Sequence, residues 1–188
     1  MKTLPNKRYS IVYADPPWRY RNYDYAYTSD GRRARRGCAK EYEVQDIGWI
    51  RSLPVSEIVA EDAVLFLWVT WPLLVEGISV IGAWGFEYKT VGFVWVKENG
   101  GRLFWGMGNW TRSNTEACLI GVRGKIRRVD AGVHSVIKAP VGRHSSKPIE
   151  VRDRIVRLMG DLPRIELFAR ERVEGWDAWG NELSTTPD

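Results

Sequence analysis

The chain has 188 residues, of which 28 are Lys or Arg and 23 are Asp or Glu, so its formal net charge is +5. This length allows one domain with a substantial core, and the positive charge favours a polyanionic partner. The chain has only two cysteines, which lie far apart, and two histidines. This composition excludes a disulfide framework, a zinc site and a histidine-based metal centre. The sequence has no apolar stretch of about 20 residues and no signal sequence, so the protein is expected to be cytoplasmic.

Apolar runs and helical periodicity alternate along the chain. Strands are predicted at 9–14, 63–70, 91–97, 116–122 and 164–169, and helices at 71–84 and 147–159. The run at 63–70 is almost continuously apolar, as expected for a central strand that is buried on both faces. Strands alternating with helices predict an α/β fold with parallel strand pairs, in which ligands bind at the carboxyl ends of the strands.

Two segments between these elements have no apolar periodicity. Residues 19–40 carry six arginines and a lysine, of which Arg32, Arg33, Arg35, Arg36 and Lys40 are clustered, so they form either a solvated loop or an arm that contacts phosphates. Residues 97–114 are rich in Gly and aromatic residues, which is typical of either a glycine-rich hairpin or a second active-site loop. The domain is expected to span 1–183, and residues 184–188 are expected to form a disordered tail.

The tetrapeptide Asp15-Pro16-Pro17-Trp18 directly follows the first predicted strand. The Asp15 carboxylate can accept a hydrogen bond from an exocyclic amine, and the Pro16 carbonyl can accept a second in a backbone fixed by proline. Trp18 offers a flat face on which a base can stack. The pattern predicts a pocket for the amino group of a nucleobase, and the structural alternative is a proline-rich turn with a buried Trp.

Five sequence blocks then follow one another in an order and spacing typical of a known family. They are 14–18, 65–70, 94–97, 116–124, and a C-terminal set made of 146–148, 165–170 and 179–181. Over residues 9–183 the chain resembles the MTA-type adenine-N6 methyltransferases. That family includes the catalytic subunit that methylates adenosine in eukaryotic mRNA, and small stand-alone members in bacteria and their viruses are thought to act on DNA.

The resemblance implies a Rossmann-like methyltransferase sheet flanked by helices, with S-adenosylmethionine as the methyl donor. Lys147 matches the residue that holds the methionine carboxylate, and its place at the start of a predicted helix suits an anion. Asn181 matches a contact to the adenosine moiety, and Glu182 stands where the family often has Gln. The cofactor-binding residues implied in this way are Asp15, Lys147, Glu166, Phe168, Arg170, Asn181 and Glu182.

Three departures from the family pattern stand out. The chain begins fourteen residues before Asp15, so another segment is expected to cover the adenine of the cofactor. Tyr42 is kept, but its neighbours on the substrate side differ. The sequence Glu-Arg-Val at 171–173 replaces a Pro-His-Asn-like run, which leaves the cofactor contacts of that loop open.

Together these features predict direct in-line transfer of a methyl group to N6 of a flipped-out adenine, in DNA in preference to RNA. Asp15, Pro16, Pro17 and Trp18 are the predicted catalytic residues, and no metal is required. The predicted substrate-binding residues are Tyr42, Arg32, Arg33, Arg35 and Arg36. RNA methylation, cytosine-N4 methylation and a non-catalytic nucleic-acid-binding subunit remain the alternatives, and the sequence does not decide between monomer and homodimer.

Overall fold

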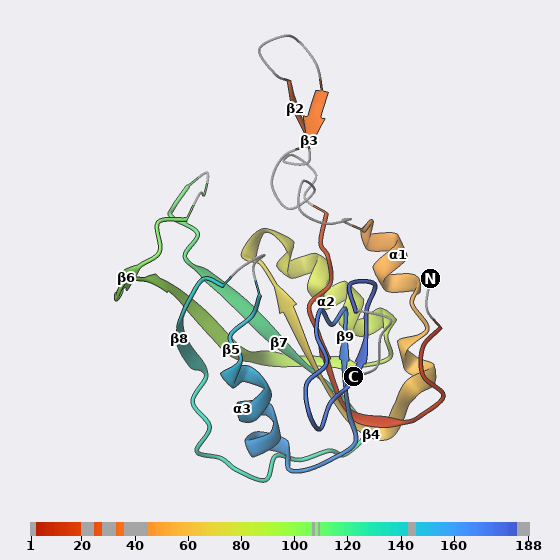
Figure 1. The fold of residues 1–188 in the computed structure, drawn as a ribbon. Coiled ribbons are helices and arrows are strands. Elements are labelled where there is room, and N and C mark those ends of the chain that lie inside the picture. The colour runs from red at the N-terminus through yellow and green to blue at the C-terminus, as the bar shows by residue number, and fades with distance from the viewer. Residues whose placement is uncertain are drawn as a thin grey trace.

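An eight-stranded sheet forms the centre of the molecule, in the order β10-β9-β1-β4-β7-β5-β6, with β8 paired to β5 (Figure 1). This computed structural model describes residues 3–19, 25–27, 33–35, 45–106, 108, 110–142 and 146–183. A separate two-stranded ribbon pairs β2 (Tyr25–Tyr27) with β3 (Arg33–Arg35). The strands of the main sheet are β1 (Tyr9–Ala14), β4 (Val59–Val69), β5 (Glu87–Asn99), β6 (Arg102–Leu103), β7 (Thr115–Arg123), β8 (Val136–Pro140), β9 (Arg164–Leu167) and β10 (Asp177–Trp179).

The two halves of the sheet differ in strand direction. The strands β10, β9, β1 and β4 run parallel to one another, so their carboxyl ends meet at one edge. In the other half, β7 is antiparallel to both β4 and β5, whereas β5 and β8 are parallel. The α/β class expected from the sequence is confirmed, and the antiparallel pairs add a feature that the alternation of strands and helices did not indicate.

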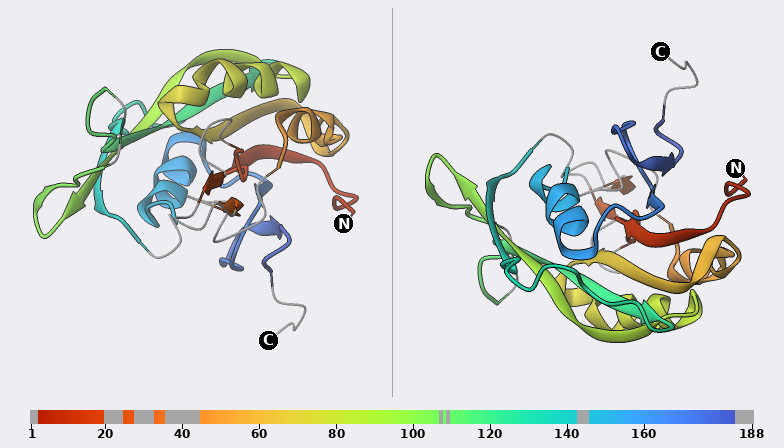
Figure 2. Two further views of the ribbon diagram at one scale, coloured as in Figure 1. Left: turned by 90° about the horizontal axis from the view of Figure 1, so that it is seen from above. Right: turned by 90° about the horizontal axis from the view of Figure 1, so that it is seen from below.

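Helices cover both faces of the sheet (Figure 2). On one face lie α1 (Ile47–Ser52) and α2 (Leu74–Ala83), and on the other lies α3 (Glu150–Met159). Successive residues of β1 point to opposite faces, so Val12 packs in the cluster with α1 and α2 while Ile11 packs in the cluster with α3. No helix in the described part of the chain is long and apolar enough to cross a membrane.

Element boundaries differ from the sequence-based expectation for local reasons. The helix expected over 71–84 starts with a 3₁₀ turn, Trp71–Leu73, and becomes α-helical at Leu74. The helix expected from 147 starts at Glu150, because Lys147 precedes Pro148 and a residue before proline is disfavoured in the helical region. The strand β4 starts at Val59 and β5 at Glu87, four residues earlier than expected in each case.

We expect Trp84→Ala to lower the free energy of unfolding by about 3–5 kcal/mol. Trp84 is fully buried, stacks on Phe168 and donates a 2.9 Å hydrogen bond from its indole to the Ile50 carbonyl, which ties α2 to α1. Urea denaturation measures the change. The matched control is Trp110→Ala, since Trp110 is 98% exposed, and its effect should stay within about 0.5 kcal/mol. Equal losses in the two variants would contradict this account of the core.

Candidate active site

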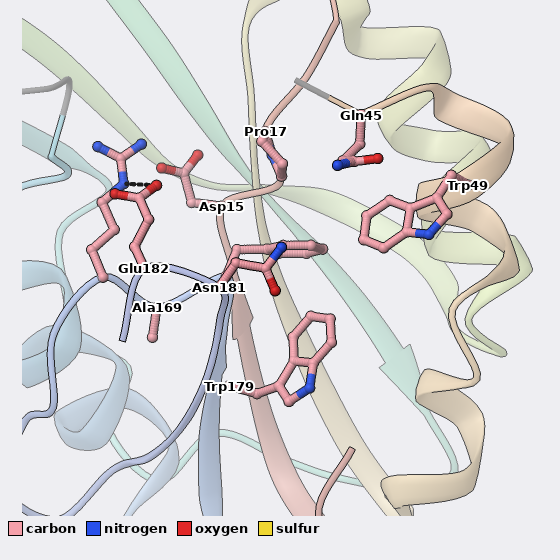
Figure 3. A pocket seen from close by; sticks show the side chains of 10 residues that line it. Asp15, Pro17, Gln45, Trp49, Ala169, Trp179, Asn181 and Glu182 are labelled. Atoms are coloured by element: carbon pink, nitrogen blue, oxygen red, sulfur yellow. Dashed lines mark ion pairs between the residues drawn. The ribbon is translucent and has the colours of Figure 1, made fainter. Parts of the chain in front are cut away.

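A cavity of about 280 Å³ lies at the carboxyl ends of β1, β9 and β10 (Figure 3). Its volume is close to the lower end of the range for small-molecule sites, about 300–1,000 Å³. The lining residues come from the segments that follow these strands and from the start of α1. They are Asp15, Pro17, Gln45, Trp49, Phe168, Ala169, Arg170, Trp179, Asn181 and Glu182.

The two sides of this cavity differ in chemistry. Figure 3 shows Asp15 and Glu182 on one side, Trp49 and Trp179 on the other, and the amide of Asn181 between them. Glu182 pairs with Arg170, with Nε to Oε1 at 3.7 Å. The cavity therefore offers charged groups at one side and flat apolar rings at the other.

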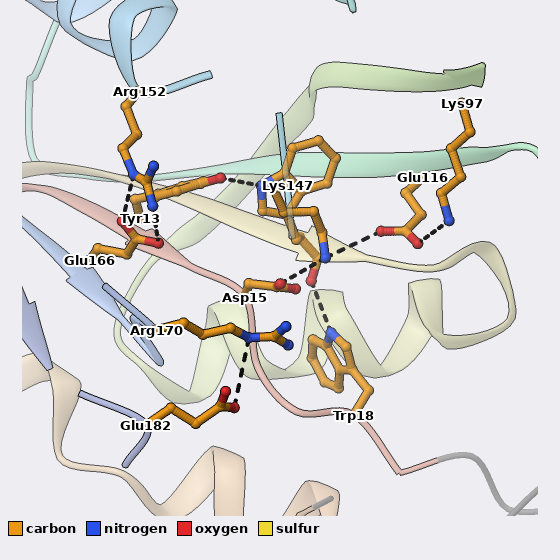
Figure 4. Close-up of polar contacts among 11 residues, drawn as sticks. Tyr13, Asp15, Trp18, Lys97, Glu116, Lys147, Arg152, Glu166, Arg170 and Glu182 are labelled. Carbon is orange, nitrogen blue, oxygen red and sulfur yellow. Dashed lines mark hydrogen bonds and ion pairs between the residues drawn. The ribbon is translucent and has the colours of Figure 1, made fainter. Parts of the chain in front are cut away.

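A largely buried chain of alternating charges extends from the Asp15 carboxylate away from the cavity (Figure 4). The Lys147 ammonium lies 2.7 Å from Asp15 Oδ2 and 3.3 Å from Glu116 Oε2. The other oxygen of Glu116 lies 2.6 Å from Lys97 Nζ. Each carboxylate thus faces at least one ammonium group, which is what burying charged groups requires.

Burial and pairing shift the ionisation of these groups in opposite directions. Burial raises the pKa of Asp15, although the Lys147 ammonium offsets part of that effect. Burial alone would lower the pKa of Lys147, but Asp15 and Glu116 outweigh it and hold that pKa above its ordinary value. Burial would also raise the pKa of Glu116, yet Lys147 and Lys97 together bring it below the usual range. Lys147 and Glu116 are therefore charged at neutral pH.

The tetrapeptide turn is fixed by backbone and indole hydrogen bonds. The Pro16 carbonyl accepts a 2.8 Å bond from the Trp18 amide, and the Pro17 carbonyl accepts a 2.9 Å bond from the Gln45 amide. A carbonyl has two lone pairs, so Pro16 keeps the capacity to accept a second bond. The structure does not support the expected stacking face of Trp18, because the residue is 6% exposed and its indole donates to the Trp68 carbonyl at 3.0 Å. Trp18 anchors the turn to β4.

Phe168 sits at the centre of the aromatic side of the cavity. Its ring contacts three indoles, at centroid distances of 6.3 Å to Trp49, 6.5 Å to Trp84 and 5.6 Å to Trp179. Its backbone has a φ of 62°, which is uncommon for a residue with a Cβ and is tolerated where the surrounding packing enforces it. The conformation directs the chain from β9 into the cavity wall.

Glu166 does not line the cavity. Its two carboxylate oxygens accept bonds of 2.7 and 3.1 Å from the guanidinium of Arg152, which lies on α3 (Figure 4). Burial raises the pKa of Glu166, and Arg152 offsets part of the shift. A direct contact of Glu166 with a bound cofactor is not favoured by this geometry; the residue joins β9 to α3.

The structure brings together many of the residues expected from the sequence. Asp15, Phe168, Arg170, Asn181 and Glu182 all line the cavity with Pro17, while Lys147 reaches it through Asp15. Three expected substrate contacts, Tyr42, Arg32 and Arg36, lie outside the described residues, and Arg33 and Arg35 belong to β3, whose side chains the structure does not describe.

Six residues of the site were not assigned from the sequence. Gln45, Trp49, Ala169 and Trp179 line the cavity, and Lys97 and Glu116 complete the charge chain. The sequence could have indicated Lys97 and Glu116 as site residues, since each is a charged residue at one end of an apolar strand run. The sequence could not have indicated Trp49, because its helix is too short to show a clear hydrophobic periodicity.

We expect Glu116→Gln to lower the free energy of unfolding by about 3 kcal/mol at neutral pH, because it leaves two buried ammonium groups without their shared anion. The pKa of Glu116 is lowered in the folded state, so its contribution is complete above the ordinary carboxyl pKa of about 4.3 and is lost as pH falls further. Urea denaturation from pH 7 down to about pH 2.5 should therefore show the difference from wild type shrinking below about pH 4.3. The control is Glu87→Gln, whose carboxylate is exposed beside Lys89. A loss from Glu116→Gln no larger than that control would contradict the prediction.

Comparisons with known proteins agree on one family. The MT-A70 family model matches residues 9–182. The Type II methyltransferase M.MunI of a Mycoplasma species is 37% identical over 191 residues, which cover 96% of this chain and 80% of that protein. The human N(6)-adenosine-methyltransferase catalytic subunit METTL3 is 30% identical over 94% of this chain, but the match covers only 28% of METTL3. A Drosophila melanogaster N(6)-adenosine-methyltransferase MT-A70-like protein is also 30% identical. The chain belongs to the MT-A70 family of N6-adenine methyltransferases.

Proposed function

We propose that this protein transfers a methyl group from S-adenosylmethionine to N6 of an adenine that has been turned out of a DNA strand. The observation that carries the proposal is the place of Asp15: its carboxylate follows a central parallel strand and lines the cavity beside a buried ammonium. The choice of DNA follows M.MunI, a type II methyltransferase of which the chain covers 80%. The choice of N6 follows the names of the adenosine methyltransferases among its relatives.

The cavity fits the proposed cofactor. When bound, S-adenosylmethionine supplies an electrophilic methyl group on a sulfonium. The aromatic side of the cavity suits its flat base, and the side with Asp15 and the Arg170–Glu182 pair suits its ribose and charged tail. In this proposal Asn181 and Glu182 bond the adenosine moiety, and Lys147 attracts the carboxylate of the tail.

The chain's own groups make the target nitrogen reactive. The lone pair of an adenine N6 is delocalised into the ring, which makes that nitrogen a poor nucleophile. Asp15 and the Pro16 carbonyl each accept a hydrogen bond from one N6–H and so favour a pyramidal nitrogen whose lone pair is localised. Transfer of the methyl group would leave S-adenosylhomocysteine and release one N6 proton to solvent. Only 22% of the Asp15 side chain is exposed, which limits the competition of water for the carboxylate, and holding the two reactants in line supplies much of the remaining acceleration.

The proposed function is tested by offering tritiated S-adenosylmethionine with single-stranded DNA, duplex DNA and RNA in parallel. The labelled product is digested to nucleosides and identified by chromatography. We expect labelled N6-methyldeoxyadenosine from DNA. Label confined to RNA would contradict the substrate, label on N4 of cytosine would contradict the target atom, and no incorporation with any polymer would contradict catalysis.

Asp15→Asn should reduce turnover on the order of a hundredfold or more, because it replaces a charged acceptor of the N6 hydrogen by a neutral amide of the same shape. The melting temperature shows whether the fold is kept. The matched control is Asp130→Asn, since Asp130 also pairs with a cation, Arg157, but lies outside the cavity. Turnover of Asp15→Asn close to that of the control would remove the catalytic role.

Methyl transfer should also fall on the acid side at a pH above the ordinary aspartate pKa of about 3.9. Burial raises the pKa of Asp15, and only its ionised form accepts the N6 hydrogen, so protonation lowers the rate as pH falls through that raised pKa. The measurement is kcat at saturating cofactor and DNA from pH 4.5 to 8. An acid-side fall that persists unchanged in Asp15→Asn would contradict its assignment to the Asp15 carboxylate.

A further inference from the structure

Trp49 is a large aromatic residue whose position is only partly explained by the core. It lies on the short helix α1, where Ile50 is the buried residue, and Trp49 only packs against the edge of that core cluster. Five other indoles, those of Trp18, Trp68, Trp71, Trp84 and Trp95, each donate a hydrogen bond to the protein. In the part of the chain that the structure describes, no such bond is made by the Trp49 indole, which instead lines the cavity.

The rings around Trp49 form an aromatic recess at the end of the cavity away from Asp15. Trp49 meets Phe168 edge to face, with an angle of 67° between the rings, and Trp179 meets Phe168 at 74°. Figure 3 shows Trp49 and Trp179 on the same side, with the amides of Gln45 and Asn181 near them. Flat rings and amide groups that both donate and accept are the chemistry that recognises a purine base.

The position of the catalytic carboxylate determines which part of the cofactor reaches this recess. The reacting methyl group must lie near Asp15, at the polar side of the cavity, so the adenosine has to extend toward the aromatic side. We infer that Trp49 forms the outer wall of the slot that holds the adenine ring of S-adenosylmethionine. This inference rests on the proposed function and deepens it, by assigning the cofactor's base to a residue of α1.

The segment that carries Trp49 is fastened to the tetrapeptide turn. The Gln45 amide donates to the Pro17 carbonyl at 2.9 Å, and Trp18 and Gln45 form a parallel bridge. One residue later, Asp46 caps α1 by accepting a 2.8 Å bond from the Gly48 amide. These bonds join the segment that carries Trp49 directly to the turn that carries the catalytic carboxylate.

Calorimetric titration with two probes, S-adenosylhomocysteine and adenosine, tests this inference. Trp49→Ala should weaken binding of both probes by the same factor, on the order of tenfold or more, because both contain the stacked base. Trp49→Phe keeps a flat ring and should bind both within about threefold of wild type. The matched control is Trp71→Ala: Trp71 is 43% exposed and does not line the cavity, so both affinities should be unchanged.

Melting temperatures without ligand show whether each variant is folded, and if Trp49→Ala unfolds, Trp49→Leu takes its place as a bulky residue without a flat ring. Unchanged affinity of the alanine or leucine variant for both probes would overturn the inference alone. A loss for S-adenosylhomocysteine with unchanged adenosine binding would overturn it too, since it would place Trp49 beside the tail. Wild-type protein that binds neither probe would overturn the proposed function together with the inference.

Discussion

The parallel register of three adjacent strands determines the geometry of the site. Ala14 of β1 is paired with Leu167 of β9, and Leu167 is paired with Trp179 of β10. The residues that follow these three positions, Asp15, Phe168 and Gly180, therefore leave the sheet at the same level. A Cβ on Gly180 would lie 2.2 Å from the Ala169 carbonyl oxygen, so only glycine permits the approach that brings Asn181 to the cavity. The catalytic carboxylate and the cofactor wall are neighbours because of strand pairing, although about 150 residues of chain separate them.

The charge chain behind Asp15 resolves a conflict between reactivity and burial. A carboxylate that is to grip an amine must be shielded from water, but a shielded carboxylate tends to become protonated. Lys147 opposes that tendency, and Glu116 with Lys97 in turn keeps Lys147 charged and in place. The protein thus maintains an ionised acceptor at the cavity wall by distributing compensating charges over β5, β7 and the approach to α3, rather than by exposing the carboxylate.

The sequence predicted the parts of the fold and site whose patterns are long or whose chemistry is local. The strand β1, the central strand β4 and the two longer helices have enough periodic residues to be recognised, and Asp15 stands beside an unusual proline pair. The short elements were missed: α1 has six residues, and β8 has one buried residue, Ile137. Trp18 was misinterpreted because a sequence motif shows which ring is present and not which way it turns. The direction of β7 was also not predicted, because apolar runs look alike in parallel and antiparallel strands.

The segment between β5 and β7, which contains β6, leaves the sheet and returns to it at neighbouring positions. The ladder between these strands places Trp95 opposite Glu116 and closes with Val96 opposite Thr115. The relative position of Lys97 and Glu116 is therefore set by the strand pairing and does not depend on the number of residues between them. A change in the number of residues between β6 and β7 is therefore expected to leave the β5–β7 register and its charged side chains in place.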